Sequence, residues 1–499
     1  MARLDVDLQS IQEARVLIDE AYEAQKVLAT YSQEQLDQIV CKMATEVSKY
    51  SEELAKLAWE ETGFGKWEDK IIKNKFASEY LYNFIKDMKC VGVISEDKEM
   101  KTMDIGVPLG VVAALVPSTN PTSTAIYKSL IALKSGNSIV FSPHPKAFKC
   151  SSITLDILIK SAEAAGAPKG SIGYLRTLTM EGTQSIMSNE KTKLVLATGG
   201  PGMVRAAYHS GTPAISGGPG NGPAFIERSA NVKKAVKDII TSKTFDNGVI
   251  CASEQSVVVE EVIAKQVRDE FIKNKAYFLN EEESRKLSKF FLRDNGTINP
   301  AIVGKNAFYI ASKAGFTVPR DTTVLLSEQD SVGRNNPYSR EKLCPVLAFY
   351  VERDWHYACE RCIELLINEG QGHTLVIHSN NEEVIREFAL KKPVFRVLVN
   401  TPSAIGGIGA TTNLFPALTL GCGALGGGSA SDNISPLNLI NVRRVGYGVR
   451  DLSYFRDEKE EVSNQCVQDN CNNSAAEALK NLDEETLKLV LARLLQEVK

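Results

Sequence analysis

Residues 107–145 have the sequence VPLGVVAALVPSTNPTSTAIYKSLIALKSGNSIVFSPHP. The run at 111–116 is continuously apolar, as a strand buried on both faces requires. An amphipathic helical pattern covers 123–134 and ends before Gly136, and a second strand is predicted at 138–141. Strands that alternate with helices at this spacing predict a parallel α/β sheet.

The same alternation extends along the chain beyond this stretch. We expect a helix at 151–165 and a strand at 194–197 and, beyond a boundary near 242–245, a strand at 256–259 and a helix at 263–273. The chain is therefore predicted to contain two α/β domains.

The first hundred residues are predicted to be helical. Ser10 with Glu13, and Ser32 with Gln35, form capping-box patterns ahead of apolar-periodic runs. A later run is expected to end near Gly63, because glycine readily adopts the left-handed conformation that closes a helix.

The composition is that of a globular protein of 499 residues, with 24% charged residues and a formal net charge of -3. Because there is no basic excess, we expect no nucleic acid partner. No stretch of about 18 uncharged apolar residues is present, and the N-terminus lacks an apolar segment, so neither a membrane span nor a secretory signal is expected. The ten cysteines have no regular spacing, which fits a reducing cytosol better than a disulfide framework.

One cysteine stands in a context that suggests chemistry. Residues 245–259 have the sequence FDNGVICASEQSVVV. A given cysteine is usually a small buried hydrophobic residue. Here a glycine-bearing turn leads to Cys251 just before a strand, which places the thiol where it can face a cleft beside backbone amides. Cys359 and Cys362 form a CxxC pattern on a predicted helix without a second pair, so we expect structural positions and no metal site.

The stretch around Cys251 resembles the nucleophile motif of CoA-acylating aldehyde dehydrogenases, including the aldehyde dehydrogenase half of bifunctional aldehyde-alcohol dehydrogenases. The likeness covers most of residues 5–460 and is densest at 107–145, 197–224, 341–350, 372–379 and 415–445. It implies the fold of that superfamily: N-terminal helices with a Rossmann-like cofactor domain, an α/β catalytic domain and a small oligomerisation element, over residues 1–243, 244–435 and 436–461. It also implies a homo-oligomer, a dimer or a tetramer.

The resemblance implies that a short aldehyde, such as acetaldehyde or propionaldehyde, is oxidised to its acyl-CoA with NAD⁺ and coenzyme A. Cys251 would form a thiohemiacetal and then an acyl-enzyme thioester. Asn120 would donate to the oxyanion, whereas the residues alone favour a turn before Pro121. His373 would assist the thiol of coenzyme A, but it could equally cap a turn.

The strand end at Thr198, Gly199 and Gly200 precedes a helix, where backbone N–H groups can approach a pyrophosphate. It lacks the GxGxxG spacing, so a plain strand-to-helix turn remains an alternative. The resemblance adds a cofactor role for Pro117, Ser118, Ser142, Pro143, His144, Gly217, Gly218 and Glu341. Ser142 replaces the lysine of hydrolytic relatives, which leaves NAD against NADP open, and Glu341 could instead be an exposed carboxylate.

The absence of one glutamate distinguishes this sequence from hydrolytic aldehyde dehydrogenases. Hydrolytic aldehyde dehydrogenases have a glutamate that activates water, and Gly217 falls at that position. Without this base, attack by water on the acyl-enzyme should be slow, which leaves the thioester for coenzyme A. A hydrolytic dehydrogenase and a non-catalytic scaffold recruited by its tail are the alternatives.

The C-terminal residues differ from the rest. Residues 462–481 begin with a polar, Asn-rich run and are predicted to be a linker. In 482–499, apolar residues recur at helical spacing and form one stripe. This helix could dock on its own dehydrogenase. It also resembles the encapsulation peptides of bacterial microcompartments, which implies shell or core proteins as partners and a place inside a microcompartment in the bacterial cytoplasm.

Overall fold

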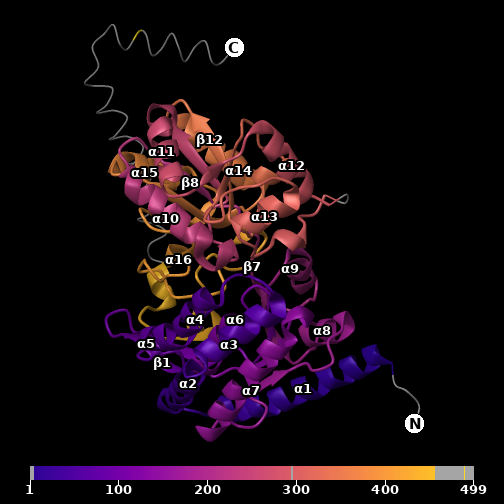
Figure 1. The fold of residues 1–499 in the computed structure, drawn as a ribbon. Coiled ribbons are helices and arrows are strands. Elements are labelled where there is room, and N and C mark those ends of the chain that lie inside the picture. The colour runs from indigo at the N-terminus through magenta and orange to yellow at the C-terminus, as the bar shows by residue number, and fades with distance from the viewer. Residues whose placement is uncertain (1–4, 294–295, 456–487, 489–499) are drawn as a thin grey trace, which may run out of the picture. The chain divides into compact units, whose positions relative to one another are not determined.

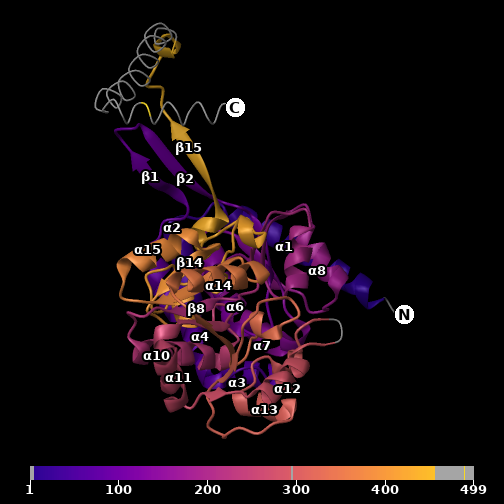
Figure 2. The same cartoon turned by 90° about the horizontal axis from the view of Figure 1, so that it is seen from above.

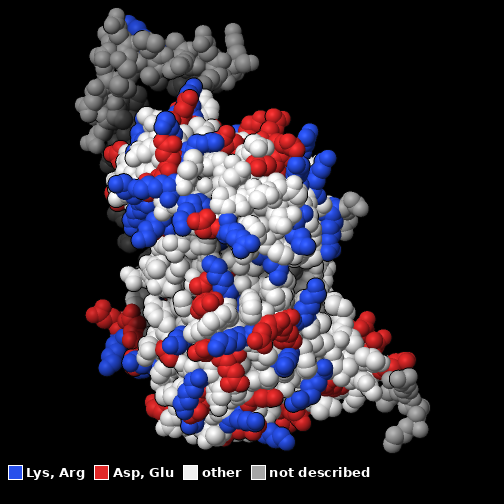
Figure 3. Space-filling model, viewed as in Figure 1, with Lys and Arg blue, Asp and Glu red and all other residues white. Residues whose placement is uncertain are grey.

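The computed structural model describes residues 5–293, 296–455 and 488. These described residues form two compact units, one from within 5–94 and 105–443 and the other from within 95–104 and 444–455. The first unit contains both large sheets, and Figure 1 shows their helices in separate halves. Acidic and basic side chains are interspersed over the face of this unit that Figure 3 shows.

Residues 6–85 are mainly helical, as predicted, but the prediction is wrong at 92–97, which form a strand. Its elements are α1 (Val6–Leu28), α2 (Gln33–Ser48), α3 (Ser51–Thr62), α4 (Trp67–Lys75), a π-helical turn η1 (Phe76–Tyr80) and α5 (Leu81–Ile85). The capping box of Ser32 is confirmed, and α3 ends at Gly63 in the left-handed conformation. The capping box predicted at Ser10 is wrong because α1 begins at Val6. The Glu13 carboxylate instead accepts backbone N–H groups of the loop at 176–177.

The first sheet has five parallel strands in the order β5-β4-β3-β6-β7. They are β3 (Val111–Leu115), β4 (Ser138–Ser142), β5 (Ile172–Tyr174), β6 (Thr192–Thr198) and β7 (Ala214–Gly217), connected through α6 (Pro121–Lys134), α7 (Phe148–Ala164), α8 (Met180–Met187) and α9 (Pro201–Tyr208). Every residue of β3 is buried, which confirms the predicted strand. Strand order reverses between β3 and β6, and ligands of such sheets bind outside the carboxyl ends at that point.

The second sheet has seven parallel strands in the order β10-β11-β12-β9-β8-β13-β14. They are β8 (Pro223–Ile226), β9 (Ser256–Glu260), β10 (Tyr277–Phe278), β11 (Leu325–Glu328), β12 (Val346–Glu352), β13 (Gly372–His378) and β14 (Val394–Val399). Its helices are α10 (Val232–Thr244), α11 (Glu261–Lys273), α12 (Glu281–Phe291), α13 (Ala307–Ala314), α14 (Trp355–Asn368), α15 (Glu382–Lys391) and α16 (Ser403–Gly407).

The chain passes from the first sheet to the second between β7 and β8. The sequence analysis placed the division of domains at 243/244. β8 lies before that point and belongs to the second sheet, and α10, which ends at Thr244, contacts β8. The apolar core of the first sheet extends to the segments around the second sheet, since Val112 of β3 belongs to the same buried cluster as Ile250 and Ile408.

A smaller sheet contains β1 (Gly92–Asp97), β2 (Thr102–Pro108) and β15 (Ile440–Gly446), in the order β1-β2-β15, and Figure 2 shows these strands side by side. The predicted return segment 436–461 thus contributes β15. The predicted linker and terminal helix lie outside the described residues, Lys488 excepted. No helix in the described part of the chain is long and apolar enough to cross a membrane.

Candidate active site

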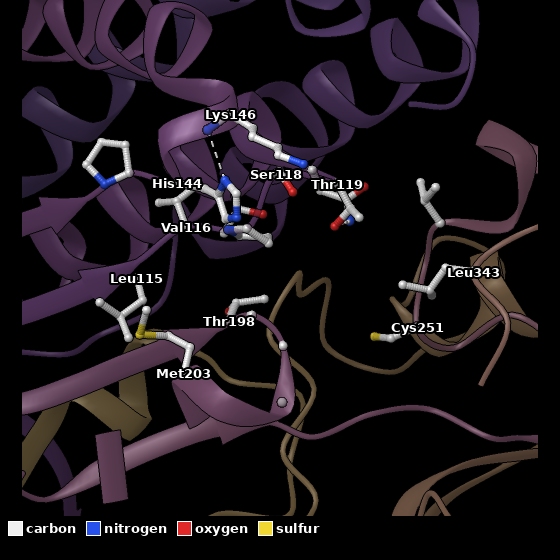
Figure 4. Close-up of a pocket in the computed structure, with 18 of the residues that line it drawn as sticks. Leu115, Val116, Ser118, Thr119, His144, Lys146, Thr198, Met203, Cys251 and Leu343 are labelled. Atoms are coloured by element: carbon white, nitrogen blue, oxygen red, sulfur yellow. Dashed lines mark hydrogen bonds between the residues drawn. The ribbon is translucent and has the colours of Figure 1, made fainter. Parts of the chain in front are cut away.

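A cavity of ≈ 650 Å³ lies at the carboxyl ends of β3, β4, β6 and β7, and the turn that carries Cys251 closes its other side (Figure 4). All predicted site residues except His373 line it: Pro117, Ser118, Asn120, Ser142, Pro143, His144, Thr198, Gly199, Gly200, Gly217, Gly218, Cys251 and Glu341. The cavity therefore joins the reversal point of the first sheet to the predicted nucleophile.

A tight turn before β9 presents Cys251. Asp246, Asn247 and Gly248 have φ values of 49°, 51° and 74°, a run of left-handed conformations that is unusual for the two non-glycine residues. The side-chain amide of Asn247 donates to the carbonyl oxygen of Gly304 over 2.9 Å, which fixes this turn to a neighbouring loop. The thiol is half-buried at the cavity wall.

His373, at the start of β13, contacts the thiol. Its Nε2 lies 3.1 Å from Cys251 Sγ, and its Nδ1 lies 2.9 Å from Thr374 Oγ1. Gly220 permits this packing, because a Cβ there would lie 1.8 Å from the carbonyl oxygen of Cys251 and 3.3 Å from His373 Cε1. His373 is buried beside the thiol and is absent from the cavity lining.

The protonation of this pair follows from burial. Burial raises the pKa of the Cys251 thiol to about 12, and the Glu341 carboxyl adds to the shift. Burial, together with the charge of Arg396, lowers the pKa of His373 to about 3. At neutral pH the pair is therefore a thiol beside a neutral imidazole, and His373 Nε2 accepts a hydrogen bond from the thiol when Nδ1 carries the ring proton.

Asn120 occupies the N-cap position of α6, but its side chain caps no helical N–H group. Its Oδ1 accepts a hydrogen bond from Lys73 Nζ, and its Nδ2 donates to Thr119 Oγ1 over 3.2 Å. Residues 118–120 form a bend directly before α6. The amide is nevertheless held toward the cavity that Cys251 also lines.

Glu341 and Gly217 define the acid-base character of the cavity. Glu341 is its only lining carboxylate, is half-buried, and accepts the N–H of Gly220 over 2.9 Å, which is incompatible with an exposed surface position. Burial raises the pKa of Glu341 to about 8. At Gly217, the last residue of β7, a Cβ would lie 3.2 Å from the carbonyl oxygen of Leu420, so the backbone crowds this position and no carboxylate stands there.

The end of the cavity remote from Cys251 suits a dinucleotide. Gly200 is the N-cap residue of α9, and nothing lies within 4 Å of where its Cβ would be, so a phosphate can come close to the backbone at this helix start. Ser142 Oγ lies 2.8 Å from Thr183 Oγ1, and His144 Nδ1 accepts the N–H of Lys146 over 3.0 Å (Figure 4). The sequence analysis missed Lys146, which its place two residues after His144 could have suggested.

The sequence analysis also missed a buried ionic cluster beside the site. Lys70 and Lys73 of α4 both pair with Asp246, and each lysine is 2% exposed. Cys359 and Cys362 lie buried in α14. Within the described ranges, no group of three or more His, Cys, Asp or Glu residues could hold a metal ion.

Comparisons with known proteins agree with this geometry. The model of the aldehyde dehydrogenase family matches residues 4–280, more than half of the chain. The bifunctional aldehyde-alcohol dehydrogenase of Escherichia coli is 45% identical over 452 residues, which cover 90% of this chain and 51% of that protein. The chain thus spans about half the length of that relative. The acetylating succinate-semialdehyde dehydrogenase of Clostridium kluyveri is 39% identical over 431 residues, 86% of this chain and 95% of that one.

Solved structures give the same result. A probable aldehyde dehydrogenase of Listeria monocytogenes has a TM-score of 0.89 at 60% identity, and the match covers 91% of this chain and 100% of that one. A propionaldehyde dehydrogenase from the fucose utilisation bacterial microcompartment of Clostridium phytofermentans has a TM-score of 0.80 at 27% identity, covering 88% and 98%. The chain therefore belongs to the aldehyde dehydrogenase family and is similar to its acylating members.

Proposed function

We propose that the protein oxidises a short, uncharged aldehyde to its acyl-CoA thioester with NAD⁺ and coenzyme A, through a covalent intermediate on Cys251. One observation carries the proposal: the sulfur of Cys251 lines the cavity and lies 3.1 Å from the neutral imidazole of His373. A thiol of high pKa needs a base at this distance to become a nucleophile.

The first step is addition of sulfur to the aldehyde carbon. His373 Nε2 takes the thiol proton as the S–C bond forms, and the electron pair of the C=O bond moves to oxygen. Asn120 Nδ2 and the backbone N–H of Cys251 are the donors that we assign to this oxyanion. His373 then releases its proton to water, and this is the proton that the overall reaction produces.

The nicotinamide ring supplies a hydride acceptor when it is bound. The glycine backbone at Gly199 and Gly200 would hold the phosphates of the dinucleotide, and Glu341 would accept a hydrogen bond from a ribose hydroxyl. Loss of hydride leaves an acyl thioester on Cys251. His373 then takes the proton of the incoming thiol, whose sulfur displaces Cys251, and Cys251 regains a proton from His373.

The cavity favours a thiol over water in this second half of the reaction. Water requires a base to attack a thioester, and hydrolytic relatives have a glutamate where this chain has Gly217. Glu341, the one lining carboxylate, already accepts a hydrogen bond from Gly220 and has a raised pKa, so it is protonated over part of the neutral range.

The charge of the lining indicates the class of aldehyde. Lys146 is its only Lys or Arg side chain, and it lies across the cavity from Cys251 (Figure 4). The residues that line the cavity with Cys251 include Phe64, Val249, Ile250, Ile408 and Leu418. A carboxylate or sulfonate on the aldehyde would find no cation there, so acetaldehyde or propionaldehyde fits better.

The test is NADH formation with acetaldehyde, propionaldehyde and succinate semialdehyde, each with and without coenzyme A. We expect turnover of the first two only with coenzyme A, and little turnover of the third. Cys251→Ala should bind NAD⁺ but form no acyl-enzyme. Sustained formation of free acid without coenzyme A, or an active Cys251→Ala enzyme, would defeat the proposal.

We also propose that the protein is a dimer or a tetramer and that residues 482–499 recruit it to a bacterial microcompartment. The apolar stripe in those residues supports this, and a relative from Clostridium phytofermentans carries a microcompartment in its name. A fusion of residues 475–499 to a fluorescent protein should form foci in cells that assemble the shells. Diffuse fluorescence would count against recruitment, and light scattering on the purified protein tests the oligomer.

A further inference from the structure

Two lysines of α4 converge on one carboxylate beside the active site. Lys70 Nζ donates to Asp246 Oδ2 over 3.0 Å, and Lys73 Nζ donates to the same oxygen. Asp246 is fully buried, and each lysine is 2% exposed. Two buried cations for one anion form a costly arrangement unless further acceptors complete it.

Those acceptors belong to the segment that carries Asn120. Lys70 Nζ also donates to the carbonyl oxygen of Thr119 over 3.2 Å, and Lys73 Nζ donates to Asn120 Oδ1. The two lysines therefore connect Asp246, five residues before Cys251, with Asn120, which lines the same cavity as the thiol.

The contact with Lys73 determines the orientation of the Asn120 side-chain amide. An asparagine amide accepts through its oxygen and donates through its nitrogen, whereas a lysine ammonium only donates. Oδ1 must therefore face Lys73, since the opposite orientation would bring two donors together. Nδ2 is left with one bond of 3.2 Å to Thr119 Oγ1 and is free to donate to an oxygen in the cavity.

We propose that Lys73 is a positioning residue, which holds the Asn120 amide so that Nδ2 faces the oxyanion of the thiohemiacetal. This inference rests on the proposed function, because it takes Asn120 as a donor to that oxygen. The ammonium on Oδ1 also polarises the amide, and this makes the N–H groups of Nδ2 stronger donors.

Asp246 connects α4 with the turn that precedes the nucleophile. Its carboxylate accepts the N–H of Lys66 over 2.6 Å, and its own N–H donates to Asp69 Oδ2 over 2.7 Å. The turn that leads to Cys251 is thus fixed to α4 at several points. One helix sets the positions of both the oxyanion donor and the nucleophile.

Lys134 offers a matched control for Lys73. It is also a buried lysine, and it donates to the carbonyl oxygen of Lys86 over 2.9 Å. It lies at the far end of α6, about 20 Å from Asn120 at 1.5 Å per residue. Lys73→Met should lower kcat for acylation about 10- to 100-fold, with KM for NAD⁺ within about twofold of wild type. Lys134→Met should change kcat less than about twofold.

A double-mutant cycle separates positioning from a general structural role. Lys73→Met should lower kcat less than about threefold when Asn120 is already alanine, because the amide through which Lys73 acts is then absent. Equal kcat losses in Lys73→Met and Lys134→Met, or the same loss with and without Asn120, would overturn the inference. If Asn120→Ala itself keeps full activity, it is the proposed role of Asn120 that fails.

Should Lys73→Met fail to fold, Lys73→Arg takes its place. Arginine keeps the charge and the donors on a longer, planar group, so a loss of about three- to tenfold is expected, again only when Asn120 is present. Alkylation of Cys251 by iodoacetamide, located by peptide mapping, forms no oxyanion and should keep the wild-type rate. A parallel loss of alkylation and acylation would show that the variant disturbs the thiol itself and would refute positioning through Asn120.

Discussion

Gly65 is the residue against which the nucleophile turn packs, and adding one methyl group there should disturb both stability and activity. A Cβ at Gly65 would lie 1.8 Å from Asp246 Oδ1 and 2.5 Å from its Cγ. Its φ of 76° is also in the left-handed region. Gly65→Ala must therefore push aside the carboxylate that Lys66, Lys70 and Lys73 share.

The expected cost has two parts. Left-handed backbone costs alanine about 1–2 kcal/mol relative to glycine. Loss of one hydrogen bond to a buried charged group costs about 1.5–3 kcal/mol, so Gly65→Ala should destabilise the fold by about 2.5–5 kcal/mol. Gly315 provides the control, because its φ is 86° and nothing lies within 4 Å of its Cβ position. Gly315→Ala should therefore lower the free energy of unfolding only by the cost of the left-handed backbone, about 1–2 kcal/mol.

Urea unfolding followed by tryptophan fluorescence measures the free energy of unfolding. The initial rate of acyl-CoA formation measures the effect on the active site. Gly65→Ala should lose activity at least about tenfold, since a displaced Asp246 releases both Lys73 and the turn before Cys251. Equal destabilisation by Gly65→Ala and Gly315→Ala would refute the argument from close packing. A fully active Gly65→Ala enzyme would refute the link to the site.

Three further predictions follow from the site. His373→Ala should slow acylation at pH 7 about 10²- to 10⁴-fold and less at high pH, where hydroxide can take the thiol proton; a pH-independent loss would argue against a base. Burial raises the pKa of Glu341 from 4.5 to about 8, so between these values the folded protein holds a proton that the unfolded chain has lost. Stability should fall as pH rises through that window, and Glu341→Gln should flatten the fall in urea unfolding; an unchanged slope would contradict the shift. Lys146 is the only cation of the lining, and Glu341 is its only carboxylate. NADP⁺ should therefore be accepted, and Lys146→Ala should raise KM for NADP⁺ about three- to fivefold more than KM for NAD⁺ in initial-rate assays; equal changes would exclude this contact.

The strands that the sequence predicted are those with continuous apolar runs. The predicted strands at 111–116 and 256–259 correspond to β3 and β9, because a parallel sheet covered on both faces needs apolar residues without interruption. β8, by contrast, has only four residues and begins with a proline, and it pairs with β13, about 150 residues further along the chain. Such pairing is not a local property, which is why the predicted division of domains fell after β8.

Local patterns also misled where distant residues compete for the same groups. Ser10 and Glu13 satisfy the capping-box rule as well as Ser32 and Gln35 do. Ser10 Oγ nevertheless donates to the carbonyl oxygen of Thr177, while Glu13 binds the next backbone N–H groups of that loop. The rule describes which bonds a helix start can make, and tertiary contacts decide whether it makes them.

The clearest departure from sequence rules is α4, and it coincides with the site. Apolar periodicity would bury Ile72 and expose the lysines, yet Ile72 is 56% exposed whereas Lys70 and Lys73 are 2% exposed. Burial of lysine is unfavourable for the fold, and it lowers the pKa of Lys73 to about 8. The two lysines donate to oxygens of Thr119, Asn120 and Asp246. Thr119 and Asn120 line the cavity, and Asp246 belongs to the turn before Cys251. The burial of the two lysines in α4 is therefore explained by the groups that they position. A prediction based on apolar periodicity alone places such lysines at the surface, so it misses this indication of a functional site.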